Sequence, residues 1–187
     1  MISDELRELI RPAILVQNII WFVIVGSIIF YIAFVYLVLG GDKALAISSA
    51  SVVDYLIYIL AAACAIGSIF YYRHALSDNN LKSFLKKDVD IDLLAKNPRT
   101  KEIDQTKLAQ LKSLSSDELK IYSLIFELQK ITILTLILNE LIVIFGSAIS
   151  FIYDDVSRIV PFGIVSLGLS FWMFPRAQAV IKRVQNF

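Results

Sequence analysis

Residues 131–153 read ITILTLILNELIVIFGSAISFIY, an apolar run of 23 residues in which Glu140 is the one charged side chain. A helix rises about 1.5 Å per residue, so about 20 residues cross the roughly 30 Å hydrocarbon core of a bilayer. A strand with open edges would leave its backbone N–H and C=O groups unpaired in lipid. The run therefore predicts a transmembrane helix.

Three further apolar runs accompany it, at residues 14–39, 52–72 and 159–174. They contain 26, 21 and 16 residues, so the last is short for a complete crossing. Arg158 and Arg176 flank that last run, and long basic side chains can extend a short span by reaching toward the headgroups. We therefore expect an all-α, polytopic membrane protein with four transmembrane helices.

The composition supports a membrane protein and disfavours other classes. Of the 187 residues 57% are hydrophobic and 19% are charged, whereas soluble domains have about 45–50% and about 25%. The net charge of +1 does not suggest a nucleic-acid-binding surface. With one cysteine, Cys64, and one histidine, His74, the chain cannot form an internal disulfide, and we expect no metal site and no cofactor.

The distribution of basic residues predicts the orientation in the membrane. Of the 18 Lys and Arg residues, all but Lys43 and Arg158 lie outside the two short loops that join paired runs. The positive-inside rule then places both termini in the cytoplasm, and we expect a bacterial-type inner membrane. The predicted organisation is a cytoplasmic N-terminal segment (1–13), a first transmembrane hairpin (14–72), a cytoplasmic helical segment (73–129), a second hairpin (130–175) and a cytoplasmic tail (176–187).

The cytoplasmic segment carries most of the charge and several local signals. Residues 73–85 are expected to continue the second membrane helix inward, and residues 86–99 to be irregular. A short helix is predicted over 103–114. Ser115 and Glu118 stand three apart, which is the spacing of a capping box. The third membrane helix is therefore expected to begin near residue 116, well before the apolar run.

Leu119, Tyr122 and Phe126 form one apolar stripe on that helical extension. Two interpretations are open. The stripe packs against the rest of the chain, as such stripes usually do, or it is a docking surface for a partner protein.

The two predicted hairpins resemble each other in sequence. Gly26-Ser27 and Gly146-Ser147 occupy corresponding places, and both hairpins end in aromatic residues followed by an arginine. This predicts a parallel repeat of two hairpins in the same orientation. Small residues let helices approach closely in lipid. The expected helix-packing residues are Gly26, Ser27, Gly67, Ser68, Gly146 and Ser150.

Glu140 lies near the predicted bilayer midplane. An ionised carboxylate at that depth costs on the order of 2.5–3.5 kcal/mol on insertion scales, so we expect a protonated, hydrogen-bonded side chain. Asp54, at the outer end of the second run, is expected to meet water. The available neutral partners for Glu140 are Asn139 and Ser147 on its own helix and Gln17, Asn18 and Trp21 on the first. Glu140 either bonds helices together or, with Asn139 and Ser147, binds an ion.

The stretch NELIVIFG at residues 139–146 resembles the carboxylate helix of the proteolipid (c) subunits of rotary ATPases. In both, a glutamate stands six residues before a glycine that follows an aromatic residue. In that family the carboxylate binds a proton or a sodium ion and turns with a ring. The resemblance implies that role for Glu140 alone, since the corresponding position of the first hairpin is Ile20.

The sequence disfavours an enzyme. It offers no nucleophile–base pair near the membrane, no phosphate-binding glycine loop and no Cys/His metal spacing. Two functions stay open. One is a structural or accessory subunit of a larger membrane complex, and the other is a proton- or sodium-handling subunit that uses Glu140. The expected partners are the lipid bilayer and other membrane subunits or further copies of the chain, without nucleic acid.

Overall fold

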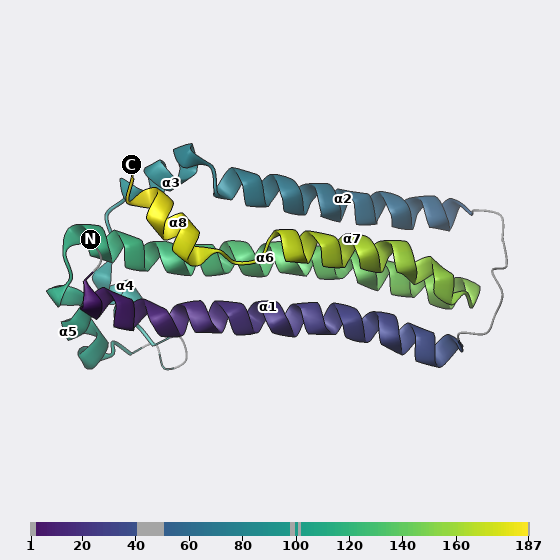
Figure 1. Cartoon of the computed structure of the whole chain (residues 1–187), viewed down its shortest axis with the longest axis horizontal. Helices are drawn as coiled ribbons and strands as arrows, with labels where there is room; N and C mark the ends of the chain where they lie inside the picture. Colours follow the sequence, from purple (N-terminus) through teal and green to yellow (C-terminus); the bar gives the residue numbers. More distant parts are fainter. Residues whose placement is uncertain (1–2, 41–50, 98–99, 101, 187) are drawn as a thin grey trace. The chain divides into compact units, whose positions relative to one another are not determined.

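A computed structural model describes residues 3–40, 51–97, 100 and 102–186 (Figure 1). It is 85% helix, and no strand occurs among these described residues. The predicted all-α class is thus confirmed. The chain divides into two compact units. We call residues 18–74 and 131–175 the apolar unit, and the remaining residues, 1–17, 75–130 and 176–187, the charged unit.

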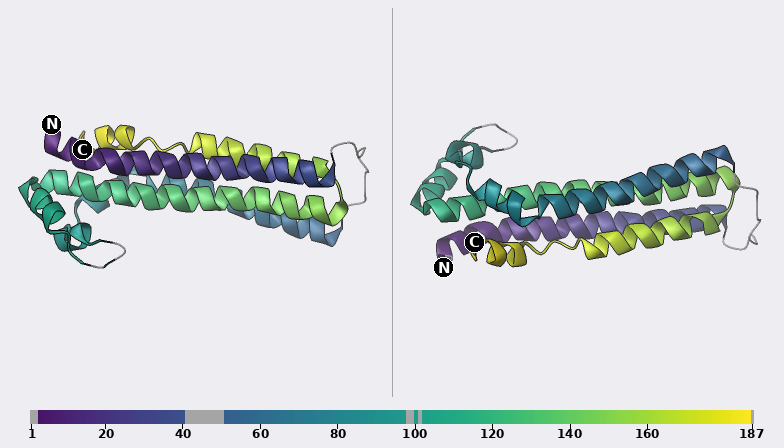
Figure 2. Two further views of the ribbon diagram at one scale, coloured as in Figure 1. Left: turned by 90° about the horizontal axis from the view of Figure 1, so that it is seen from below. Right: turned by 90° about the horizontal axis from the view of Figure 1, so that it is seen from above.

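The apolar unit contains four helical segments. They belong to α1 (Asp4–Leu39), α2 (Val52–Ala75), α6 (Ser116–Tyr153) and α7 (Ile159–Trp172), and a short 3-10 turn, η1 (Val156–Arg158), precedes α7. Within this unit the segments run alongside one another in each view (Figures 1 and 2). The helices form because long apolar runs must satisfy their backbone groups internally.

Helix α6 lies at the centre of the apolar unit. Half of its most apolar 18 residues are buried, against 17% in α1 and 22% in α2. Val143 of α6 packs with Ile28 and Val35 of α1, whereas Ile142 and Ile149 pack against α2 and α7. Both α1 and α2 therefore expose long apolar faces, as expected where lipid is the solvent.

Among the residues that the structure describes, three helices, α1, α2 and α6, are each long and apolar enough to cross a membrane. A fourth candidate exists only if η1, α7 and α8 (Ala177–Val184) count as one broken span. Helix α7 alone has 14 residues and spans about 21 Å. The structure thus bears out the helical, membrane-compatible part of the prediction and leaves the number of spans at three or four.

The charged unit has its own apolar core. Leu6 and Ile10 of α1, Leu111, Ile125 of α6 and Ile181 of α8 are all buried within it. Its short helices are α3 (Asp78–Leu85), α4 (Ile91–Ala95) and α5 (Gln105–Ser113). The side chains of Ser77, Asp90 and Asp104 cap their N-termini by accepting backbone N–H groups.

The predicted start of the third helix is confirmed. Helix α6 begins at Ser116, and Ser115 and Glu118 form the expected capping box. The Glu118 carboxylate accepts the Ser115 backbone N–H at 3.1 Å, and the Ser115 hydroxyl accepts the Glu118 N–H at 3.4 Å. Glu118 also accepts the backbone N–H of Ser3 at 3.0 Å, which joins the start of the chain to α6.

Two expectations for the cytoplasmic segment are wrong. The second helix continues through residues 73–75 but not to 85, because α2 ends at Ala75 and Ser77 caps a separate helix, α3. Residues 86–99 are not wholly irregular, since Asp90 caps α4. The helix predicted over 103–114 is present as α5. Lys43, counted in the first loop, and Pro98–Arg99, within the segment expected to be irregular, lie outside the described residues.

Candidate functional site

A polar cluster centred on Asn139 lies inside the apolar unit. The side chain of Asn139 is fully buried on α6. It accepts the hydroxyl of Ser68 on α2 at 2.7 Å and donates to the hydroxyl of Ser170 on α7 at 3.3 Å. Its backbone carbonyl accepts the hydroxyl of Ser166 at 2.6 Å. These bonds tie three helices together, which is the role polar side chains commonly have between helices in lipid.

Glu140 follows Asn139 and faces a different helix. Its Oε1 lies 2.5 Å from the hydroxyl oxygen of Ser27 on α1. That hydroxyl also lies 2.7 Å from the carbonyl oxygen of Ile24. A hydroxyl has one proton and cannot serve both acceptors well. The Ser27 hydroxyl therefore divides its proton between a carboxyl oxygen of Glu140 and the Ile24 carbonyl, and its contact with Glu140 joins α1 to α6.

The predicted partners of Glu140 have other bonds. Ser147 donates to the carbonyl of Val143 on its own helix at 2.9 Å. The indole N–H of Trp21 donates to the Ser170 carbonyl at 2.9 Å. The partner that sequence reasoning missed is Ser27, which it had assigned to helix packing. The hydrogen bonds of Asn139, Glu140 and Ser147 therefore do not converge on one ligand set.

Gln17 and Asn18 were also candidate helix-contact residues. In the charged unit Gln17 is buried and donates to the carbonyl of Leu128 at 3.4 Å. Asn18 is half-buried at the start of the apolar unit's part of α1. Gln17 thus joins α1 to α6 by a bond to a backbone carbonyl.

An ion pair closes one end of the apolar unit. The Asp54 carboxylate of α2 is 1% exposed and lies 3.3 Å from the Arg158 guanidinium. Arg158 also lies 3.4 Å from Asp155, and its guanidinium stands 3.9 Å from the centre of the Tyr153 ring. The expectation that Asp54 meets water is therefore wrong. Arg158 does not extend freely toward the headgroups, because it is held by two carboxylates and a ring.

The predicted packing residues behave in two ways. A Cβ added at Gly146 would lie 2.6 Å from Cβ of Phe162, so α6 and α7 approach closely there. Added at Gly26 or Gly67, it would meet nothing within 4 Å. These two glycines therefore pack no helix within the unit, which corrects the prediction.

The two Gly-Ser pairs of the proposed repeat thus make different contacts. Gly163, which the sequence reasoning missed, approaches the end of Ile32.

Of the three serines in that set, Ser68 and Ser150 are fully buried, whereas Ser27 is half-buried. Ser68 joins α2 to the Asn139 cluster. A small side chain at each of these positions admits the neighbouring helix.

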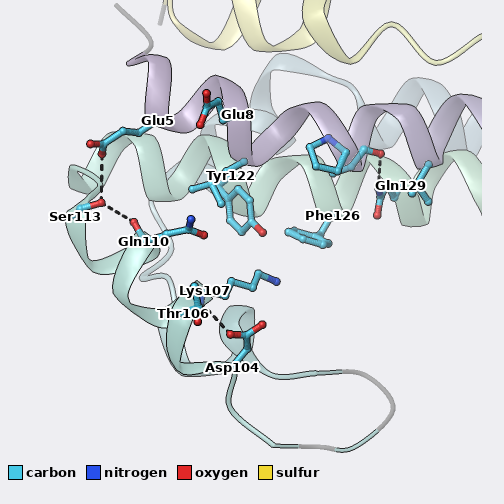
Figure 3. Close-up of a pocket in the computed structure, with 14 residues that line it drawn as sticks. Glu5, Glu8, Asp104, Thr106, Lys107, Gln110, Ser113, Tyr122, Phe126 and Gln129 are labelled. Carbon is cyan, nitrogen blue, oxygen red and sulfur yellow. Dashed lines mark hydrogen bonds between the residues drawn. The ribbon is translucent and has the colours of Figure 1, made fainter.

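A groove of about 840 Å³ opens on the charged unit between the first turns of α1, helix α5 and the start of α6 (Figure 3). We call it the acidic groove. The residues that give it its chemistry are Glu5, Glu8, Asp104, Lys107, Tyr122 and Phe126. At its floor Gln129 of α6 donates to the carbonyl of Ala13 at 2.8 Å, which fixes α1 on α6.

Lys107 crosses the acidic groove toward two aromatic rings (Figure 3). Its ammonium lies 5.8 Å from the centre of the Tyr122 ring and 5.5 Å from that of Phe126, within the range of cation–π attraction. Burial lowers the pKa of Lys107, and the nearby Asp104 carboxylate offsets part of that shift. Among the described lining residues Lys107 carries the one ammonium, which thus contacts the two rings, and three carboxylates line the walls of the groove.

The apolar stripe of α6 is largely internal. Leu119 and Tyr122 are buried in the core of the charged unit, and Phe126 packs partly against it. This burial favours the packing interpretation for Leu119. Tyr122 and Phe126 each still present an edge to the acidic groove.

In the part of the chain that the structure describes, no group of three or more His, Cys, Asp or Glu side chains is arranged to hold a metal ion. We compared the chain with protein-family models, curated proteins and solved structures, and none of the three comparisons found a match.

Proposed function

We propose that the protein is a non-catalytic accessory subunit of a larger membrane complex, and that it holds a partner through the acidic groove. Its apolar helices anchor it in the bilayer, with both termini and the charged unit in the cytoplasm, as the positive-inside rule indicates. The interior polar groups of the apolar unit, Asn139 above all, are occupied in joining helices. These polar groups thus favour a role in holding the helices together over a role in binding a substrate.

The acidic groove is the observation that carries this proposal. The groove presents three carboxylates and the edges of two aromatic rings, and the Lys107 ammonium lies over those rings. These features favour a ligand that is basic and also has apolar side chains. Electrostatic complementarity of this kind gives specificity and fast association. The occupant we propose is a basic cytoplasmic segment of an unlike membrane subunit.

Charge reversal in the groove tests the proposal. We expect the double variant Glu5→Lys with Glu8→Lys to lower the affinity for the partner by at least about tenfold, because like charges brought together cost several kcal/mol. The measurement is the stoichiometry of the partner that co-purifies with the tagged full chain in mild detergent.

The matched control is Asp88→Lys with Asp92→Lys, which makes the same change of charge at exposed positions outside the groove. Wild type and control should retain the partner at a fixed ratio. Equal retention by all three proteins would refute the groove as the docking site, and the absence of any stoichiometric partner would refute the accessory role.

The alternative is a proton- or sodium-handling subunit. The place of Glu140 favours it, because an ionisable side chain within an apolar helix, here in contact with Ser27, is by default a functional candidate. Under the accessory proposal the same contact only joins α1 to α6, a bond worth about 1 kcal/mol or less.

The variant Glu140→Gln separates the two functions. We expect it to fold and to keep its partner, because the amide oxygen of glutamine can still accept the Ser27 hydroxyl. Proton and sodium flux through vesicles containing the intact complex should match wild type, as should the flux of the control Glu127→Gln, whose carboxylate pairs with Lys130. Normal assembly with lost flux would establish the ion-handling function instead.

A further inference from the structure

A second cavity on the charged unit has the opposite charge. It encloses about 610 Å³ between the first turns of α1 and helix α8. Its basic lining residues are Arg7, Arg11 and Lys182, and none of the described residues that line it is acidic. Two glutamines complete the polar side. Three cations on one cavity favour an anion.

The spacing of the two arginines suits a phosphate group. Arg7 and Arg11 stand four residues apart on α1, so they share one face of the helix about 6 Å apart along its axis. A guanidinium can bind a phosphate through two parallel N–H bonds, and an ammonium adds a point charge. Arg7 also lies 3.6 Å from Asp4 in a pair whose side chains are 67% and 97% exposed. Such an exposed pair is weak and screened by salt.

The cavity has an apolar floor beneath its cations. Ile10 of α1 and Ile181 of α8 are 6% and 3% exposed, and Ile14 also lines the cavity. A small inorganic anion has no apolar surface to bury against these isoleucines. A phosphate that carries glycerol and acyl chains can bury apolar groups against it.

The position of the cavity along the chain matches the membrane boundary. Ile14 begins the apolar run of α1, and Arg11 precedes it by three residues, about 4.5 Å of helix. Helix α8 begins three residues after the last apolar run ends at Phe174. Basic residues directly on the cytoplasmic side of membrane helices bind anionic headgroups.

We propose that the cavity formed by Arg7, Arg11 and Lys182 binds the phosphate headgroup of an anionic phospholipid, with Ile10, Ile14 and Ile181 under its glycerol and upper acyl groups. This site is independent of the acidic groove and of the proposed partner. It would fix the charged unit at the surface of the inner leaflet.

Lipid retention measured by native mass spectrometry tests the proposal. The full chain is extracted into detergent containing equal amounts of phosphatidylglycerol and phosphatidylcholine, and the bound lipids are counted. We expect wild type to retain phosphatidylglycerol in roughly tenfold excess, and the double variant Arg11→Gln with Lys182→Gln to lose most of that preference, because charge-assisted bonds are about twice as strong as neutral ones.

The control is Lys87→Gln with Lys112→Gln, which removes the same charge at exposed positions outside the cavity and should keep the preference. Lys182 is itself exposed, so Lys182→Gln alone gives a smaller loss should the double variant not fold. Equal retention of both lipids by wild type, or an equal loss in the control, would overturn the proposal.

An added arm distinguishes a lipid from a free phosphate. Inorganic phosphate in excess should leave the retained phosphatidylglycerol unchanged, because it cannot use the apolar floor. Complete displacement by inorganic phosphate would show a simple anion site and overturn the assignment to lipid.

Discussion

We expect Arg158→Met to lower the free energy of unfolding of the apolar unit by more than the loss of a surface arginine does. The substitution leaves the Asp54 carboxylate, which is 1% exposed, without its counter-charge. Removing one partner of a buried ion pair is destabilising, because an uncompensated charge stays in a medium that solvates it poorly. Methionine keeps most of the side-chain volume, so lost packing contributes little. The measurement is reversible unfolding of the purified chain in mild detergent with added denaturant.

The matched control is Arg176→Met. This substitution removes the same charge, but the Arg176 side chain is exposed and makes no capping hydrogen bond to α8. Its effect should stay within about 0.5 kcal/mol, as for most surface positions. A second substitution, Asp54→Asn, should restore part of the loss in the Arg158→Met background. Equal small effects of both arginine substitutions would contradict the ion pair and support two free arginines at the membrane surface.

The second large effect is expected at Gly146. A methyl group there would lie 2.6 Å from Cβ of Phe162, an atom next to the backbone that cannot swing away. Helices α6 and α7 must separate, and overpacking of this kind costs typically about 1–3 kcal/mol. We therefore expect Gly146→Ala to lower the free energy of unfolding by that amount in the same assay.

Gly26 and Gly67 provide controls of identical chemistry. Both lie inside helices, and a Cβ added at either meets nothing within 4 Å. Alanine at these positions should be neutral or stabilising by about 0.4–1 kcal/mol, because it reduces the freedom of the unfolded chain. A loss at all three glycines would show that alanine in these helices is harmful for a reason other than the contact with Phe162.

The long helices could be predicted from the sequence because their signals are local. The apolar runs required helices in lipid, and the capping box at Ser115 and Glu118 marked the start of α6 correctly. The sequence around the break between α2 and α3 stays compatible with a helix, so the break was not predicted. Helix α2 ends at Ala75, and Ser77 caps α3 two residues later. A single good cap is worth about 1 kcal/mol, enough to decide such a boundary.

The contacts between helices were harder to predict, because they depend on how each helix is rotated about its axis. Asn139 and Glu140 are neighbours in sequence, yet one bonds to α2 and α7 and the other to α1. The pairing of Asp54 with Arg158 joins residues 104 positions apart. The available signal was that Asp54 and Arg158 carry opposite charges at the same predicted end of their helices. From the sequence they were interpreted as two separate groups at the membrane surface.

The most direct test of the accessory role is a native mass spectrum of the protein extracted in mild detergent from the membrane in which it naturally occurs. The proposed function predicts one or two copies of this chain bound at fixed stoichiometry to unlike membrane subunits. A ring of many identical copies would contradict it, and would make Glu140 and its contact with Ser27 the centre of an ion-handling subunit.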